Sequence, residues 1–186
     1  MIPRWKILVD SMSRYYPFVG AEIGVQLGRM SREVLKGTPS IKKYYAIDPF
    51  YFYNDFEKAC CDIPEQYRTK IGRDQAGMDY AYEVFLQNTN KFKDKVWLLR
   101  MFSEEAAQYI YDDSLDFCFI DGNHLYEYVK RDIELYFPKV KKGGLIGGHD
   151  YAMAGTGVKQ AVDEYFNQDD LFLHHDWTWW IIKRRR

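Results

Sequence analysis

Short apolar runs alternate with helical patterns along most of the chain. The apolar runs are bounded by polar or turn residues and predict strands over 19–25, 44–47, 96–101, 115–120, 145–148 and 178–182. Apolar and aromatic residues at helical spacing lie between these runs and predict helices over 31–36, 79–92, 125–137 and 158–166. Strands that alternate with helices form a parallel sheet with right-handed crossovers. The pattern therefore predicts an α/β fold.

One segment departs from this alternation. Residues 49–95 are longer than a crossover between parallel strands requires. The first part of the segment is aromatic, with Phe50, Tyr51, Phe52, Tyr53 and Phe56. Insertions of this length are often lids or binding loops, and an extra helix packed at the sheet edge is an equal alternative. No repeat or linker divides the chain, so we expect residues 1–186 to form one domain, either alone or as a module of a longer protein.

Composition excludes several classes of protein. The 186 residues carry 26 basic and 27 acidic side chains, and this balance argues against a nucleic-acid partner. No apolar run approaches the ~18 residues of a membrane span, and we expect no membrane association. The three cysteines form no CxxC pair and indicate a reducing compartment, so we expect a cytoplasmic location.

Polar residues and glycines lie where the predicted strands end. Asp48 ends the second strand, Ser103 follows the third, Asp121 ends the fourth, and His149 and Asp150 end the fifth. In an open parallel sheet, ligands bind outside the carboxyl ends of the strands. We therefore expect a binding site at this edge of the sheet.

A glycine turn follows the first strand, in the order Glu22-Ile23-Gly24-Val25-Gln26-Leu27-Gly28. Glycines allow a sharp turn and let a ligand approach the backbone. Gln26 stands where the dinucleotide fingerprint has its second glycine, which weakens an NAD or FAD assignment. Asp48 lies 20 residues after Gly28, and a carboxylate there can accept hydrogen bonds from both hydroxyls of a ribose.

Two acidic strand ends suggest a metal site. Neighbouring strands lie ~4.8 Å apart, so the carboxylates of Asp121 and Asp150 can share one cation if their strands are adjacent. Oxygen ligands favour Mg²⁺ or Mn²⁺, and an imidazole from His149 would favour Mn²⁺. The alternative is that each aspartate only caps a helix at a strand-to-helix turn.

His124 lies three residues after Asp121 and is a candidate general base. This spacing turns the imidazole back over the strand end, and an unperturbed pKa near 6.5 suits proton abstraction at neutral pH. The alternative is a capping or solvated histidine. We expect His174 and His175 to be ordinary loop residues and Lys183–Arg186 to be a solvated tail.

The order of these motifs resembles that of class I S-adenosylmethionine-dependent methyltransferases. The resemblance covers about residues 19–166 and rests on the glycine turn, Ile47-Asp48, residues 98–103 (LLRMFS) and residues 114–124. More narrowly, residues 119–126 (FIDGNHLY) and 143–151 (GGLIGGHDY) look like the small metal-dependent O-methyltransferases related to catechol and macrolide-sugar methyltransferases.

The resemblance implies a Rossmann-like methyltransferase fold with a mostly parallel seven-stranded sheet and helices on both faces. It also implies a cofactor site for S-adenosylmethionine, in which Glu22, Gly24 and Gly28 shape the methionine pocket, Asp48 holds the ribose, Phe102 and Ser103 flank the adenine, and Asp121 lies beside the cofactor. The implied ligands of a divalent metal, Mg²⁺ or Mn²⁺, are Asp121, His149 and Asp150. Relatives often carry an acidic or amide pair where this chain has His149-Asp150, so Asp150 is the firmer ligand and His149 an alternative neighbour of the ligands.

The predicted reaction is metal-assisted methyl transfer to a hydroxyl of a small-molecule or glycan acceptor. Asp121 and His124 are the catalytic candidates, and His124 is the base. A sugar is the first choice of acceptor, and a phenol is the alternative within the class. An NAD-dependent sugar epimerase or reductase and a non-catalytic cofactor-binding scaffold are the alternatives outside it. Several rings are candidates for stacking on an acceptor, although the tryptophans are first expected to pack the last strand: Tyr51, Tyr53, Trp177, Trp179 and Trp180.

Overall fold

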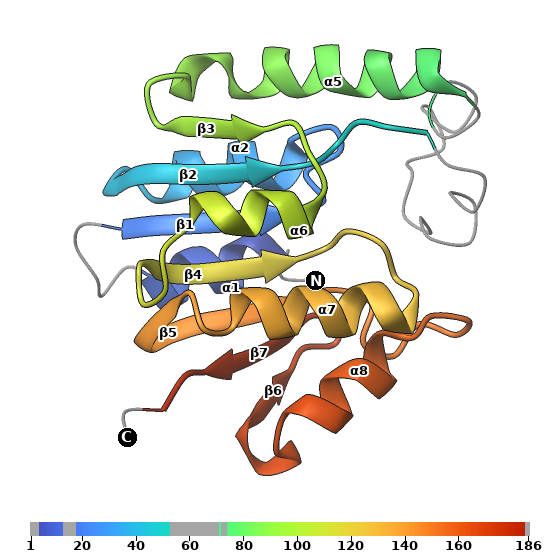
Figure 1. Ribbon diagram of the computed structural model, residues 1–186. Helices are drawn as coiled ribbons and strands as arrows, with labels where there is room; N and C mark the ends of the chain where they lie inside the picture. The colour runs from blue at the N-terminus through green and yellow to red at the C-terminus, as the bar shows by residue number, and fades with distance from the viewer. Residues whose placement is uncertain (1–3, 13–17, 53–70, 72–73, 185–186) are drawn as a thin grey trace.

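The protein is an α/β structure built on one seven-stranded sheet (Figure 1). The computed structural model describes residues 4–12, 18–52, 71 and 74–184. The strands lie in the order β3-β2-β1-β4-β5-β7-β6. Their bounds are β1 Phe18–Ile23, β2 Ile41–Ile47, β3 Val96–Leu99, β4 Leu115–Ile120, β5 Val140–Gly148, β6 Leu171–Leu173 and β7 Trp179–Ile182.

The sheet is mostly parallel, as predicted. Strands β3, β2, β1, β4 and β5 pair in parallel, and β7 pairs antiparallel with both β5 and β6. The apolar pattern did not predict β6, because a strand of three residues is too short for an alternation to be recognised. It also began the fifth strand too late, since β5 starts at Val140 and pairs with Leu115 ahead of a register shift.

Helices cover both faces of the sheet. α6, α7 and α8 pack on one face, while α1, α2 and α5 pack on the other (Figure 1). The α-helices span α1 Arg4–Met12, α2 Arg29–Gly37, α5 Gln75–Thr89, α6 Ser103–Ala106, α7 Tyr126–Tyr136 and α8 Val158–Tyr165. Short 3₁₀ turns are η1 Asn90–Phe92, η2 Ala107–Tyr109 and η3 Gln168–Asp170. The sequence pattern did not predict α1 or α6.

The central strands are buried on both faces. In β4, Cys118 and Ile120 pack with the helices of the α7 face, whereas Phe117 and Phe119 pack with those of the α2 face. Strands covered on both sides read as continuous apolar runs, which is the pattern that the sequence shows. The helix layers on both faces of the sheet therefore follow from the apolar composition of the strands.

The segment after β2 contributes a helix to the α2 face. α5 begins at Gln75, where the side chain of Asp74 accepts a hydrogen bond from the N–H of Gly77 (2.8 Å) and caps the helix. Met78, Ala81 and Phe85 of α5 are buried in the same cluster as α2. The packed-helix alternative thus describes residues 75–89, while Tyr53, Phe56, Cys60 and Cys61 lie outside the described residues. In the described part of the chain, no helix is long and apolar enough to cross a membrane.

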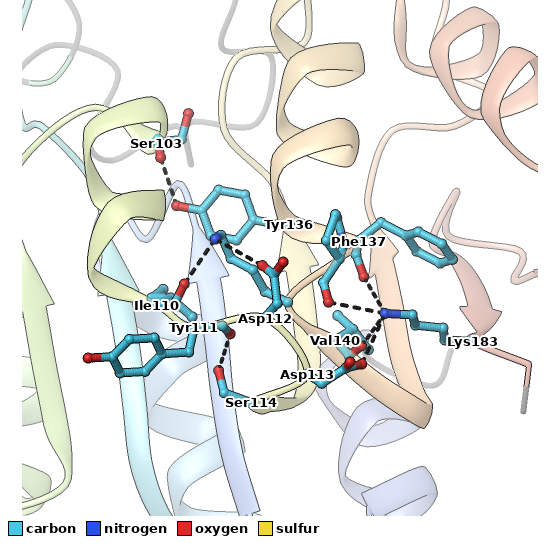
Figure 2. A network of polar contacts seen from close by, with 12 residues as sticks. Ser103, Ile110, Tyr111, Asp112, Asp113, Ser114, Tyr136, Phe137, Val140 and Lys183 are labelled. Atoms are coloured by element: carbon cyan, nitrogen blue, oxygen red, sulfur yellow. Dashed lines mark hydrogen bonds and ion pairs between the residues drawn. The ribbon is translucent and has the colours of Figure 1, made fainter.

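Two lysines hold the amino ends of β4 and β5 (Figure 2). The Lys183 ammonium donates to the carbonyls of Phe137 (3.1 Å), Pro138 (3.1 Å) and Val140 (2.6 Å), and it lies 3.4 Å from Asp113. Lys139, 9% exposed, donates to the carbonyl of Ile110 (2.9 Å). The expectation of a solvated tail is therefore wrong for Lys183, because folding brings these carbonyls to it.

Candidate functional site

The predicted polar strand ends meet at one edge of the sheet. The strand order reverses between β1 and β4, and the arrowheads of β1, β2, β3 and β4 point to the same edge (Figure 1). Ligands of doubly wound sheets bind at such a reversal. The structure thus brings together Gly24 after β1, Asp48 after β2, Asp121 after β4 and Asp150 after β5.

The turn after β1 is shaped for close approach of neighbouring backbone. Gly24 has φ 82, and a Cβ at this position would lie 2.2 Å from the carbonyl oxygen of Asp121. Its N–H donates to the carbonyl of Ile47 (2.8 Å). Gly28 also has a positive φ of 66, and a Cβ there would meet the ring of Phe85 at 2.7 Å. Both glycines are therefore required by the backbone itself, so that this turn can lie between the ends of β2 and β4.

Asp48 organises the adjoining backbone. One carboxylate oxygen accepts the N–H of Gln26 (2.9 Å) and the other accepts the N–H of Phe50 (2.8 Å). Burial raises the pKa of Asp48, and these two hydrogen bonds oppose the rise. A carboxylate has about four acceptor positions, so the two oxygens retain capacity for the hydroxyls of a ribose.

Glu22 lies beneath this turn. The side chain is 2% exposed and accepts hydrogen bonds from the hydroxyls of Ser31 (2.5 Å) and Tyr44. These contacts tie β1 to α2 and β2. Glu22 therefore holds together the elements that carry the glycine turn.

The end of β3 provides an exposed aromatic surface. Phe102 is 43% exposed, and its ring meets that of Tyr51 edge to face, with the centroids 6.3 Å apart. Ser103 begins α6, and its carbonyl accepts the hydroxyl of Tyr136 (2.8 Å). The Ser103 side chain bonds to Asp132, a buried acid of α7 that the sequence analysis missed. Its signal was an acidic residue on the apolar stripe of the helix that contains Val129 and Ile133.

Three ionisable side chains converge at the ends of β4 and β5. Asp121, His124 and Asp150 each offer one ligand atom, and these atoms lie within 4.8 Å of one another. Nε2 of His124 lies 3.0 Å from Oδ2 of Asp150 and 3.8 Å from Oδ1 of Asp121. His124 lies just before α7, where its carbonyl accepts the N–H of Gly157 (2.8 Å). The predicted turn of the imidazole back towards the strand end is what the structure shows.

His149 contacts the cluster from one side. The strand register places Ile120 opposite Gly148, so that Asp121 and His149 follow in neighbouring positions. Asp150 has φ 61, a left-handed conformation, and its Oδ1 lies 2.9 Å from Nδ1 of His149. In this arrangement His124, which its spacing to Asp121 predicted as the base, lies in the group of potential ligand atoms. His149, which the resemblance implied as a ligand, lies next to that group.

The electrostatics of the cluster follow from burial and opposite charge. Burial lowers the pKa of His124, but the carboxylates of Asp121 and Asp150 outweigh it and raise the pKa to about 11. Burial raises the pKa of Asp150, but the two imidazoles outweigh it and hold the pKa well below its usual range. Each charge is thus balanced by its neighbours within a site that is largely screened from water.

The cluster fits a divalent cation. Within the described part of the chain, both ring nitrogens of His124 and both carboxylate oxygens of Asp150 are buried without a partner in hydrogen-bond geometry. Buried polar atoms in proteins are normally hydrogen-bonded, and oxygen and imidazole ligands suit Mg²⁺ or Mn²⁺. The spacing of these ligand atoms, within 4.8 Å of one another, therefore suits a shared cation.

The other histidines lie elsewhere. His174 and His175 occupy the turn between β6 and β7, where Nδ1 of His174 lies 3.0 Å from Asp176. They are loop residues, as expected. Trp179 and Trp180 are buried in β7, whereas Trp177 is 43% exposed in the same turn.

Strand order, glycine turn and acidic strand ends together define the class I methyltransferase fold. A family model described as a methyltransferase domain matches residues 21–151. The chain belongs to this family and is an S-adenosylmethionine-dependent methyltransferase, which confirms the class that the motifs indicated.

Solved structures share this fold at low sequence identity. The O-methyltransferase NovP is 22% identical with a TM-score of 0.68, over 97% of this chain and 78% of NovP. CalS11, a TDP-rhamnose 3'-O-methyltransferase of calicheamicin biosynthesis, is 16% identical with a TM-score of 0.63, over 96% of this chain and 76% of CalS11. A methyltransferase from Geobacter sulfurreducens is 15% identical with a TM-score of 0.61, over all of this chain and 81% of that one. No curated protein sequence matches the chain significantly.

Proposed function

We propose that the protein is a divalent-metal-assisted O-methyltransferase that methylates a hydroxyl of a sugar or glycoside. The observation that carries this proposal is the cluster of Asp121, His124 and Asp150, whose ligand atoms converge beside the glycine turn, with those of His124 and Asp150 buried. The likeness to NovP and to CalS11, named as a sugar O-methyltransferase, supports the choice of a hydroxyl and of a sugar.

The cofactor would lie over β1, β2 and β3. Asp48 would accept the ribose hydroxyls, Gly24 would let the methionine part approach the backbone, and Phe102 would cover the adenine next to Ser103. When bound, S-adenosylmethionine supplies the methyl group. The residues at the ends of β1, β2 and β3 would bind and orient the cofactor. Most of the rate enhancement would come from aligning the cofactor with the acceptor.

The acceptor would lie over β4 and β5. Asp121 and Asp150 would hold a divalent cation, with His149 positioned to support Asp150 through its 2.9 Å contact. The cation, when bound, acts as a Lewis acid that stabilises negative charge on an oxygen. His124 would take the proton of the acceptor hydroxyl at Nε2 once a cation on Asp121 and Asp150 offsets the carboxylate charge that otherwise keeps the imidazole protonated.

Calorimetry with S-adenosylmethionine and its demethylated product tests the cofactor half of the proposal. We expect binding to the wild type and its loss in Asp48→Ala. The matched control is Asp170→Ala, a carboxylate near β6 that pairs with Arg184 far from the glycine turn. Equal affinity of the wild type and Asp48→Ala would contradict the assigned site.

Titration with Mn²⁺ tests the other half. We expect Asp121→Asn and Asp150→Asn to lose Mn²⁺ binding, while Asp112→Asn, an exposed carboxylate at the opposite edge, retains it. Methyl transfer to sugars and phenols, with and without EDTA, then identifies the acceptor class. Transfer that is unaffected by EDTA would remove the metal from the proposal, and preference for phenols would replace the sugar.

A further inference from the structure

The turn between β6 and β7 holds an exposed tryptophan in an unusual backbone conformation. The N–H of Trp177 donates to the carbonyl of His174 (3.1 Å), and the N–H of His174 donates to the carbonyl of Thr178 (2.8 Å). This pattern is a three-residue hairpin loop that closes with a residue in the left-handed region. Trp177 occupies that position with φ 67.

Glycine is the residue that normally occupies such a position, because a side chain there is strained. A bulky residue with positive φ is a genuine outlier, and outliers of this kind cluster at functional sites. Trp177 also differs from its neighbours in β7, since Trp179 and Trp180 are 0% and 5% exposed but Trp177 is 43% exposed. A large part of this residue therefore stays uncovered by the fold.

The turn is fastened to the candidate active site. The carbonyl of Trp177 accepts the N–H of Tyr151 (3.0 Å), the residue directly after Asp150. Asp176 holds the other side of the loop, because its carboxylate accepts the N–H of Thr178 (3.2 Å) and contacts His174. Trp177 is thus held at a defined place, one backbone hydrogen bond from the segment that carries Asp150.

The strand order separates the two halves of the site. Asp48 and Phe102 lie at β2 and β3, on one side of the reversal point, while β7 and β6 continue the sheet beyond β5 on the other side. An acceptor whose hydroxyl lies at the β4 and β5 ends can therefore reach the β6–β7 turn, where Trp177 offers an exposed indole near the exposed His175. Tyr51 contacts Phe102 and lies on the cofactor half instead.

We infer that Trp177 is a specificity-determining residue that stacks on the ring of the acceptor. This inference rests on the proposed function. An indole offers a large, rigid apolar face and one N–H donor, which suits the C–H face of a sugar ring. The strained backbone position leaves Trp177 43% exposed next to the segment that carries Asp150, while Trp179 and Trp180 in the strand beyond stay packed.

A comparison of Trp177→Gly with Trp177→Phe tests the inference. Glycine removes the ring and favours the observed backbone, so we expect the stability of this variant to equal or exceed that of the wild type. We expect its affinity for the acceptor to fall about tenfold. Phenylalanine keeps a ring and restores most of the affinity. Phe172→Ala, which removes another exposed ring of the same hairpin, leaves the affinity unchanged.

Binding is measured by ¹⁹F NMR of protein labelled with 5-fluorotryptophan, in the presence of Mg²⁺ and S-adenosylhomocysteine. The probes are methyl α-L-rhamnopyranoside and catechol at millimolar concentrations. The resonance that is missing from Trp177→Gly identifies Trp177, and we expect one probe to shift it more than the resonances of Trp179 and Trp180.

Three results would overturn the inference: neither probe moves the Trp177 resonance, a bound probe has equal affinity for the wild type and Trp177→Gly, or Trp177→Gly is markedly less stable and the ring is structural. Failure of S-adenosylhomocysteine to bind at all would instead overturn the proposed function, so the two failures are distinct.

Discussion

The polar side chains at the two edges of the sheet differ in how they are hydrogen-bonded. At the amino edge, the ammonium of Lys183 is matched by three backbone carbonyls, and Lys139 donates to a fourth (Figure 2). At the carboxyl edge, within the described chain, the polar side-chain atoms of His124 and Asp150 are buried without hydrogen-bond geometry to any partner.

The difference separates stability from function. The half-buried ammonium of Lys183 joins the ends of β4, β5 and β7, because removing it would leave three carbonyls without their donor. At the carboxyl edge the side chains are paired in charge but not in hydrogen-bond geometry, so the carboxylate oxygens of Asp150 stay available to a ligand. The sheet thus has a structural edge, at the amino ends of its parallel strands, and a reactive edge, at their carboxyl ends.

The largest expected effect comes from removing a carboxylate of the reactive edge. Asp121→Asn should lower the rate of methyl transfer by on the order of a thousandfold, because a charge that holds the cation and faces His124 is lost. Single-turnover kinetics measure the rate, and far-ultraviolet circular dichroism confirms the fold. Asp112→Asn serves as the control, and a loss below tenfold would contradict the role of Asp121.

At the structural edge, the expected effect is on stability. Lys183→Met should lower the free energy of unfolding by about 2 kcal/mol, because the carbonyls of Phe137, Pro138 and Val140 lose their donor. Urea denaturation measures this loss. The exposed Lys142→Met should be neutral, and both variants should retain the cofactor affinity of the wild type. A changed affinity in Lys183→Met would show that the two edges are coupled.

Asp132 makes stability depend on pH. Burial raises its pKa to about 7, so the folded protein keeps a proton that the unfolded chain releases near its ordinary value of 3.8. Stability from this group should therefore fall as the pH rises from about 4 to about 7. Asp132→Asn should remove this slope and gain on the order of 2 kcal/mol at neutral pH.

Urea denaturation of both proteins across this pH range provides the measurement. Asp169→Asn, at an exposed carboxylate in η3, is the control and should keep the slope of the wild type. The same slope in Asp132→Asn would show that the carboxylate is not protonated in the folded state.

The smallest expected effect concerns Phe102. Phe102→Ala should weaken S-adenosylhomocysteine binding about tenfold, since base–aromatic stacking contributes about 1–3 kcal/mol. Stability should change little because the ring is 43% exposed. Calorimetry measures the affinity, and Tyr109→Ala, an exposed ring of η2, is the control. Unchanged binding would place the adenine away from the end of β3.

Local chemistry in the sequence determined most of the fold and the list of candidate residues. Apolar runs covered on both faces marked six of the seven strands, and glycines and acids at their ends marked the binding edge. These features can be predicted from the sequence because strand burial, tight turns and helix periodicity depend on residues close together in the chain. Short elements such as β6 were not predicted, because three residues are too few to show a periodic pattern.

Only the tertiary structure decided which of those residues meet. His124 and His149 were both candidates near the metal, and the register of β4 and β5 with the left-handed Asp150 placed His124 among the ligand atoms. The same long-range pairing turned Lys183 from a tail residue into a half-buried donor to three carbonyls and left Trp177 exposed while Thr178 and Trp179 were covered. The physical reason is that each of these outcomes depends on contacts between segments far apart in sequence, and a linear pattern carries no information about the strand order that brings them together.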